Sequence, residues 1–100
     1  MKKIIVAFDV DGTLIHQAGP KADTPRYDVI QLYKILESLG CDMWIWSGGG
    51  VDYAQRWADK LGLRAQISAK GNMRPDIAVD DFPSDDPYLS PTLGVINLKV

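Results

Sequence analysis

The chain has 100 residues, of which 46% are hydrophobic and 24% are charged, and its formal net charge is -2. This composition is typical of one small globular domain and excludes an intrinsically disordered chain. The negative net charge argues against a protein that holds nucleic acid through general attraction to the phosphate backbone. A nucleic-acid end stays open as a substrate, because a local basic patch can bind one.

The single cysteine, Cys41, excludes an internal disulfide and suits a reducing compartment. The apolar run near the N-terminus stops at Asp9, which makes it too short for a signal peptide. No stretch approaches the roughly 20 apolar residues that a membrane-spanning helix needs. We therefore expect a cytoplasmic protein that does not enter a membrane.

The first part of the chain predicts a strand, an irregular segment and a helix. Residues 4–8 form a continuous apolar run with β-branched side chains, which is typical of a strand buried on both faces of a parallel sheet. Residues 15–26 show no period and contain two prolines, so they predict an irregular flap. From about Tyr27 to the stop at Gly40, a helix is indicated by apolar residues at three- and four-residue spacing, namely Val29, Leu32, Ile35, Leu36 and Leu39.

The rest of the chain continues the alternation. The apolar residues 43–46 predict a second strand, which ends in Ser47 and three glycines. A second helix is expected over residues 51–61, where Gly62 would stop it. Its apolar face would consist of Ala54, Trp57, Ala58 and Leu61. Shorter apolar segments predict further strands over residues 64–68, 77–79 and 95–100.

This order of elements predicts the α/β class, with a single doubly wound, Rossmann-like parallel sheet and flanking helices. We expect residues 1–100 to form one domain, because no composition shift marks a boundary. The interval from Lys70 to Asp80 is too short for a full helix, so the third crossover should be abbreviated. Residues 82–92 hold three prolines and should form a surface connection.

Polar residues follow the apolar runs at the points where a parallel sheet binds its ligands, beyond the carboxyl ends of the strands. Clustered carboxylates repel one another unless a cation lies among them, and hard oxygen ligands suit Mg²⁺. A glycine-rich turn that opens a helix, together with a serine hydroxyl and a lysine, suits a phosphate group. The residues concerned are Asp9, Asp11, Ser47, Lys70, Asp80 and Asp81.

The DVDGT segment of residues 9–13, after an apolar strand, resembles the first motif of the haloacid dehalogenase (HAD) superfamily of phosphatases. Ser47 is similar to the second motif of that family and Lys70 to the third. Asp80 and Asp81, followed by Asp85, resemble the fourth motif. The similarity covers residues 4–85 in the family's order. The intervals between the first three motifs leave no room for a cap domain, so the chain resembles a minimal capless member.

The resemblance implies a Mg²⁺-dependent phosphomonoesterase, a hydrolase with two catalytic aspartates. Asp9 would be the nucleophile that forms an aspartyl-phosphate, and Asp11 would be the general acid and base. The metal would be held by the Asp9 carboxylate and the Asp11 backbone carbonyl. Asp81 aligns better with the direct metal ligand of the family, and Asp80 would support it, although the choice between these two stays open.

The resemblance also implies how the substrate is held. Ser47, the backbone of Gly48 in the glycine-rich turn and Lys70 would bind the phosphoryl oxygens. Without a cap the site should be open, so the phosphorylated substrate can be a macromolecule such as a nucleic-acid end or a phosphoprotein. A neighbouring subunit can instead supply the missing cover, and the oligomeric state is left open.

Two other classes of function compete with the enzyme. The first is a non-catalytic phosphate- or metal-binding module that regulates a partner, and the presence of Asp11 counts against it because binding alone does not need that residue. The second is a response-regulator receiver, which also clusters acids around Mg²⁺. The DVDGT order at the first strand and the lack of a mid-chain phosphoacceptor aspartate argue against the receiver. His16 is solitary, so no zinc site is expected.

Overall fold

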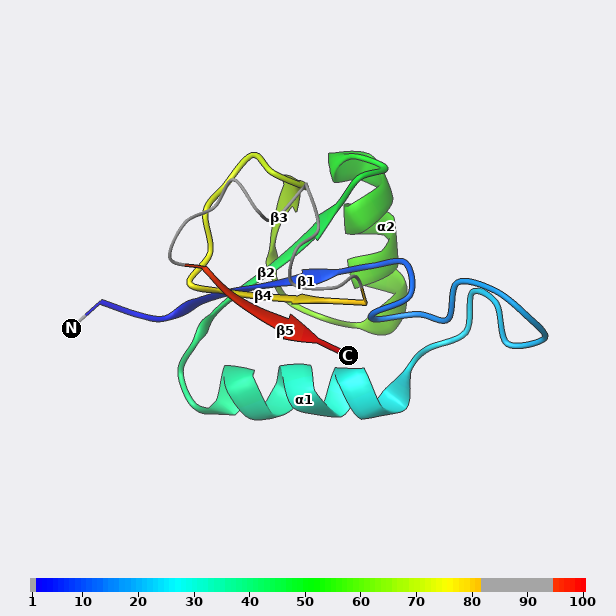
Figure 1. Cartoon of the computed structure of the whole chain (residues 1–100), viewed down its shortest axis with the longest axis horizontal. Coiled ribbons are helices and arrows are strands. Elements are labelled where there is room, and N and C mark those ends of the chain that lie inside the picture. The colour runs from blue at the N-terminus through cyan, green and yellow to red at the C-terminus, as the bar shows by residue number, and fades with distance from the viewer. Residues whose placement is uncertain (1, 82–94) are drawn as a thin grey trace.

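The computed structural model describes residues 2–81 and 95–100. Within them, five parallel strands form one sheet in the order β3-β2-β1-β4-β5 (Figure 1). The strands are β1 (Ile5–Asp9), β2 (Asp42–Ser47), β3 (Gln66–Ala69), β4 (Ile77–Asp80) and β5 (Ile96–Lys99). The helices are α1 (Tyr27–Ser38) and α2 (Val51–Leu61). The sheet extends in both directions from β1, which confirms the predicted α/β class and its doubly wound strand order.

The observed bounds follow the predicted ones closely, and the differences fall at strand ends. Helix α2 has the predicted bounds, and its C-cap Gly62 adopts the left-handed conformation with a φ of 68°. Strand β3 begins at Gln66 rather than Arg64. In the part of the chain that the structure describes, no helix combines the length and hydrophobicity that crossing a bilayer requires.

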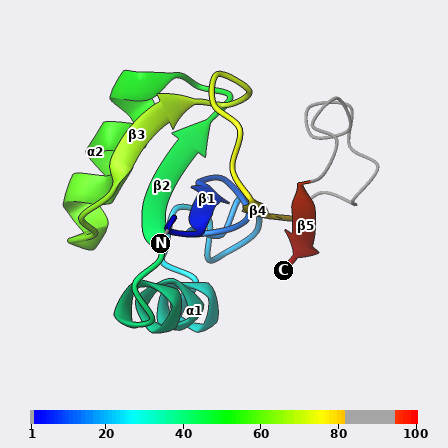
Figure 2. The same ribbon diagram turned by 90° about the vertical axis from the view of Figure 1, so that its left-hand side faces the viewer.

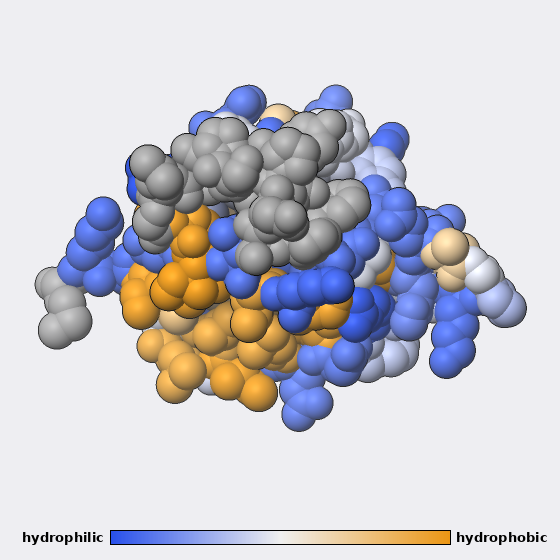
Figure 3. All heavy atoms as spheres, in the orientation of Figure 1, coloured by the Kyte–Doolittle hydropathy of each residue, from blue (hydrophilic) through white to orange (hydrophobic). Residues whose placement is uncertain are grey.

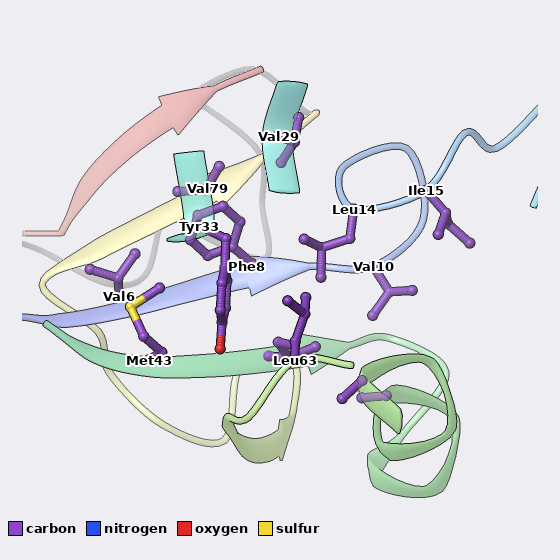
Figure 4. Packing of buried hydrophobic residues seen from close by; sticks show 13 residues of the cluster. Val6, Phe8, Val10, Leu14, Ile15, Val29, Tyr33, Met43, Leu63 and Val79 are labelled. Atoms are coloured by element: carbon purple, nitrogen blue, oxygen red, sulfur yellow. The ribbon is translucent and has the colours of Figure 1, made fainter. Parts of the chain in front are cut away.

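Both helices pack on the same face of the sheet. Alternate residues of β1 and β2 point to this face and join side chains of α1 and α2 in one buried cluster (Figure 4). There the Phe8 ring of β1 meets the Tyr33 ring of α1 edge to face, with ring centroids 5.2 Å apart. The connections from β1 to β2 and from β2 to β3 move in the same direction along the sheet. Because crossovers between parallel strands are almost always right-handed, both are expected to place their helix on the same side. Figure 2 shows this arrangement with the sheet nearly end-on.

The predicted apolar face of α1 is partly wrong. Leu32 and Leu36 pack against the core as expected, whereas Ile35 and Leu39 are 48% and 73% exposed. Tyr33, which lies outside the predicted face, is fully buried. The face of α1 that packs on the sheet is therefore centred on the aromatic Tyr33, and not on the face that carries Ile35 and Leu39. Figure 3 shows the resulting hydrophobic area on the α1 side of the molecule.

The opposite face of the sheet is built differently. Ala7, Trp46 and Ala78 are fully buried there, and they are contacted by the partly buried Trp44, Met73 and Val95. The β3–β4 connection, residues 70–76, contains no helix. The prediction of an abbreviated third crossover is confirmed, and among the described residues no helix covers this second face.

The β1–α1 connection contains the predicted flap. Ile15 and Pro25 form a single antiparallel bridge at its base. Beyond the bridge, the backbone N–H of His16 donates to the Thr24 carbonyl and that of Asp23 donates to the His16 carbonyl, each at 2.8 Å. The flap has no helix or strand of its own, so it is a local extension rather than a cap. The predicted surface connection over residues 82–92 lies outside the described residues.

Candidate functional site

The predicted polar residues meet at one edge of the sheet. Strand β1 ends at Asp9, β2 at Ser47 and β4 at Asp80. Lys70 directly follows β3, and Asp81 directly follows β4. Since all these strands are parallel, their carboxyl ends lie at the same edge, which is where open α/β sheets bind ligands. The convergence that the sequence predicts is present in the fold.

Three aspartates form an acidic cluster at this edge, namely Asp9, Asp80 and Asp81. One carboxylate oxygen from each lies within 4.8 Å of the other two. Asp9 and Asp80 are only 6% and 1% exposed, and Asp81 is half-buried. These are the three carboxylates that the sequence predicts as metal ligands. Asp85, the last acid of the fourth motif, lies outside the described residues.

Burial and mutual repulsion disfavour the charged forms of the acidic cluster. Burial, followed by the nearby Asp80 carboxylate, raises the pKa of Asp9 from 3.8 to about 7. Lys70 acts in the opposite direction without cancelling these effects. Burial, and next a side-chain hydrogen bond with Asp80, also raise the pKa of Asp81. A cation among the three carboxylates would lower their pKa values again, because a nearby opposite charge favours the ionised form.

Lys70 provides a positive charge beside the acidic cluster. Its ammonium nitrogen lies 2.6 Å from Asp80 Oδ2 and 4.0 Å from Asp9 Oδ1. The side chain is only 5% exposed, so these are buried ion pairs. A single ammonium charge cannot neutralise three carboxylates. The lysine therefore stabilises the ionised acidic cluster only in part.

Gly12 and Arg26 shape the loop beside the acidic cluster, and the sequence predicted Gly12 only as part of the DVDGT motif. Gly12 has a φ of 76° and lies against the Asp81 carboxylate. A β-carbon at Gly12 would be 2.6 Å from Asp81 Cγ, which is closer than such atoms approach. Arg26, at the base of the flap, donates from Nη1 to the Gly12 carbonyl at 2.7 Å. Glycine is therefore required here both for its backbone conformation and for the space that Asp81 occupies.

The acidic cluster fits a divalent cation. Carboxylate oxygens are hard donors of the kind that Mg²⁺ prefers. Among the described residues, Asp81 Oδ1 is buried and has no hydrogen-bond partner, and an unsatisfied buried acceptor is costly unless a ligand bonds to it. The pairing of Asp80 with Lys70 leaves Asp81 as the better candidate for direct coordination.

The Asp11 carboxylate lies outside the acidic cluster and contacts α2. Its Oδ1 accepts a hydrogen bond from the Tyr53 hydroxyl at 2.6 Å. Burial, followed by this hydrogen bond, raises the pKa of Tyr53, so the phenol keeps its proton and acts as the donor. Tyr53 is not among the site residues that the sequence predicts. Its position four residues before Trp57, on the apolar side of the predicted helix, is the signal that would have identified it as inward-facing.

Ser47 and the glycines after it form the turn that opens α2. The Ser47 side chain is buried, and its Oγ accepts a hydrogen bond from the Gly49 N–H at 2.9 Å. The Ser47 carbonyl accepts from the Lys70 backbone N–H at 3.0 Å, which ties the ends of β2 and β3 together. Gly48 is exposed, and no atom of the described residues lies within 4 Å of where its β-carbon would be. The turn thus presents open backbone at a helix start, where anions bind readily.

No protein-family model matches this chain, and no curated protein matches it. The residues at the sheet edge separate into three parts: the acidic cluster with Lys70, the Asp11–Tyr53 pair, and the turn after Ser47. A buried carboxylate, a second carboxylate outside the cluster and a glycine-rich turn at a helix start are compatible with phosphoryl transfer through a carboxylate nucleophile.

Proposed function

We propose that this protein is a capless phosphatase of the HAD type, which hydrolyses a phosphate monoester with the help of Mg²⁺. The observation that carries the proposal is the acidic cluster of Asp9, Asp80 and Asp81, with oxygens within 4.8 Å of one another and with Lys70 beside it. Without a ligand, the charged forms of these buried carboxylates are unfavourable, because burial raises the pKa of Asp9 and of Asp81. A bound metal ion would stabilise the charged forms, which gives a reason for the presence of the cluster.

Asp9 is the proposed nucleophile. A carboxylate oxygen of Asp9 attacks phosphorus and forms an aspartyl-phosphate, while the bond from phosphorus to the leaving oxygen breaks. Water then attacks the same phosphorus, the bond to Asp9 breaks, and inorganic phosphate leaves with the carboxylate restored. The burial of Asp9 supports this role, since a desolvated carboxylate is a more reactive nucleophile once it is ionised.

Asp11 is the proposed general acid and base. It gives a proton to the leaving oxygen in the first step and takes one from the attacking water in the second. Its separation from the acidic cluster supports this role, because a carboxylate outside the cluster can exchange protons while Asp9, Asp80 and Asp81 hold charge.

The cation would be held by Asp9, Asp81 and the Asp11 backbone carbonyl, with Asp80 in support. When bound, Mg²⁺ supplies positive charge that neutralises the phosphoryl oxygens and the carboxylates around them. The phosphoryl group would be bound by Ser47, the backbone of Gly48 and Lys70. Lys70 can contact both the carboxylates and the phosphoryl group, because its ammonium group already lies at the acidic cluster.

The proposed substrate is a phosphorylated macromolecule, for example a nucleic-acid end or a phosphoprotein. The flap is the largest extension near the site among the described residues, and it forms no separate domain that would enclose a small molecule. The single cysteine, Cys41, is unpaired and suits a reducing compartment, so we place the proposed enzyme in the cytoplasm.

The test is hydrolysis of p-nitrophenyl phosphate by the purified protein with and without Mg²⁺, followed by a panel of phosphopeptides and end-phosphorylated oligonucleotides. We expect turnover only with Mg²⁺, and we expect Asp9→Asn to abolish it. Asp59→Asn is the matched control, because Asp59 is an exposed acid near the end of α2. Activity that survives in the Asp9→Asn variant would refute the nucleophile. Binding of Mg²⁺ and phosphate without turnover of any substrate would favour a regulatory binding module instead.

A further inference from the structure

The Tyr53 side chain is fixed in place by the helix that carries it. Tyr53 lies in the first turn of α2, and the next turns bury Ala54 and Ala58 in the core. The ring also lies against the turn after Ser47, where a β-carbon at Gly49 would be 3.2 Å from two ring carbons of Tyr53. A rigid helix and a close-fitting turn therefore leave the phenol little freedom, and its hydroxyl ends 2.6 Å from Asp11 Oδ1.

This hydrogen bond makes the two oxygens of Asp11 unequal. Oδ1 accepts from Tyr53, and a hydrogen bond to a carboxylate is both short and directional. Asp11 follows the end of β1 in a loop, where a carboxylate without such a partner would sample several rotamers. With Oδ1 engaged, Oδ2 is the oxygen left to exchange a proton.

We propose that Tyr53 is a positioning residue for Asp11, which aligns the carboxylate so that Oδ2 transfers the proton to and from the reacting oxygens. The inference rests on the proposed phosphatase function and adds a residue to it. In the first step the proton moves from Asp11 Oδ2 to the leaving oxygen as the bond to phosphorus breaks. In the second step a proton returns from the attacking water to Oδ2. Tyr53 keeps its own proton throughout.

The test compares Tyr53→Phe with the wild type on a series of phosphate monoesters whose leaving groups range from nitrophenols to simple alcohols. A misaligned general acid matters most for a poor leaving group, which cannot depart without a proton. We expect kcat for an alkyl phosphate to fall by about 10- to 100-fold, and kcat for a dinitrophenyl phosphate to change by less than about threefold. KM should stay within about threefold of the wild-type value, because Tyr53 does not hold the phosphoryl group.

Further variants separate the positioning of Asp11 from a general loss of structure. Tyr27→Phe removes the same hydroxyl from an exposed tyrosine, and it should leave every substrate unaffected. In the Asp11→Asn background, Tyr53→Phe should have no additional effect, because the residue it positions is gone. If Tyr53→Phe does not fold, Gly49→Ala keeps the hydroxyl and presses on the Tyr53 ring, and it should shift the leaving-group dependence in the same direction. Its β-carbon would also lie 3.3 Å from Ser47 Oγ, so a rise in KM for every ester would report the effect on phosphate binding and not on Tyr53.

The outcomes distinguish the two proposals. If the wild type hydrolyses neither these esters nor the phosphopeptides and end-phosphorylated oligonucleotides with Mg²⁺, the phosphatase function is wrong and the role of Tyr53 falls with it. If the wild type is active and Asp11→Asn changes the leaving-group dependence, but Tyr53→Phe or Gly49→Ala does not, the role of Tyr53 alone is refuted. Additive losses in the double variant would refute it as well.

Discussion

The Asp81 carboxylate lies in space that is available only because residue 12 is glycine. A β-carbon on Gly12 would be 2.6 Å from Asp81 Cγ, so a side chain at this position and the observed carboxylate position exclude each other. The contact joins the loop after β1 to the loop after β4. It links the segment that carries both proposed catalytic aspartates to the residue that we favour as a direct metal ligand.

Gly12→Ala tests this contact. We expect the variant to lose most Mg²⁺ affinity, since the methyl group displaces Asp81, and to lose about 1–2 kcal/mol of stability from its left-handed backbone. Gly19→Ala is the matched control, because Gly19 has a similar φ of 82° but no atom within 4 Å of its β-carbon position. Calorimetric Mg²⁺ titration and thermal unfolding of both variants separate the two effects. Equal Mg²⁺ affinity in the two variants would contradict the contact.

The stability of the metal-free protein should depend on pH through Asp9. Its pKa is about 7 in the folded protein against 3.8 as the ordinary value, so the native state binds this proton more tightly than the unfolded chain does. The free energy of unfolding should therefore fall as pH rises from roughly 4 to 7. Mg²⁺ competes with the proton, so the increase in Tm that it causes should be larger at roughly pH 8 than at roughly pH 5.5.

Thermal unfolding with and without Mg²⁺ at both pH values measures this dependence. In Asp9→Asn the titrating group is gone, and both the fall in stability and the pH dependence of the Mg²⁺ effect should become smaller. An increase in Tm that is independent of pH in the wild type would contradict the proposed competition.

Lys70→Met should destabilise the protein. The ammonium group lies 2.6 Å from Asp80 in a buried pair, and removing one partner of such a pair costs about 3–5 kcal/mol. The loss should be smaller with Mg²⁺, because the metal would supply positive charge to the same carboxylates. Lys34→Met, at an exposed position on α1, is the control and should change stability by less than about 0.5 kcal/mol. Chemical denaturation in both conditions checks this, and an equal loss with and without Mg²⁺ would count against a shared metal site.

Asp80→Asn and Asp81→Asn should weaken Mg²⁺ binding to different extents. Asp80 pairs with Lys70, whereas Asp81 Oδ1 is buried and has no partner within residues 2–81 and 95–100. We expect Asp81→Asn to abolish measurable Mg²⁺ binding and Asp80→Asn to weaken it by about 10- to 100-fold, as for residues that support a metal ligand. Calorimetric titration of the two variants decides the question that the sequence left open, and the reverse order would assign direct coordination to Asp80.

Much of the fold could be predicted because its signals are local. The apolar run before Asp9 and the glycine stop at Gly62 act within one element, so short stretches of sequence contain them. Parallel strands present their carboxyl ends at one edge of a sheet, so the convergence of Asp9, Lys70 and Asp80 could be predicted without knowledge of the packing. The buried face of α1 was predicted less well, because a face is chosen by what it packs against, and the partner of Tyr33 is Phe8 on another element.

By itself, the sequence determined the α/β class, the order of the elements and the set of polar residues at the sheet edge. Only the tertiary structure decided how these residues divide, with Asp9, Asp80 and Asp81 in one cluster beside Lys70 and with Asp11 held by Tyr53. The reason is physical. Hydrophobic periodicity and turn chemistry act between neighbours in the chain, whereas a hydrogen bond or a close approach depends on ångström-scale distances between residues far apart in it, such as Asp11 and Tyr53 or Gly12 and Asp81.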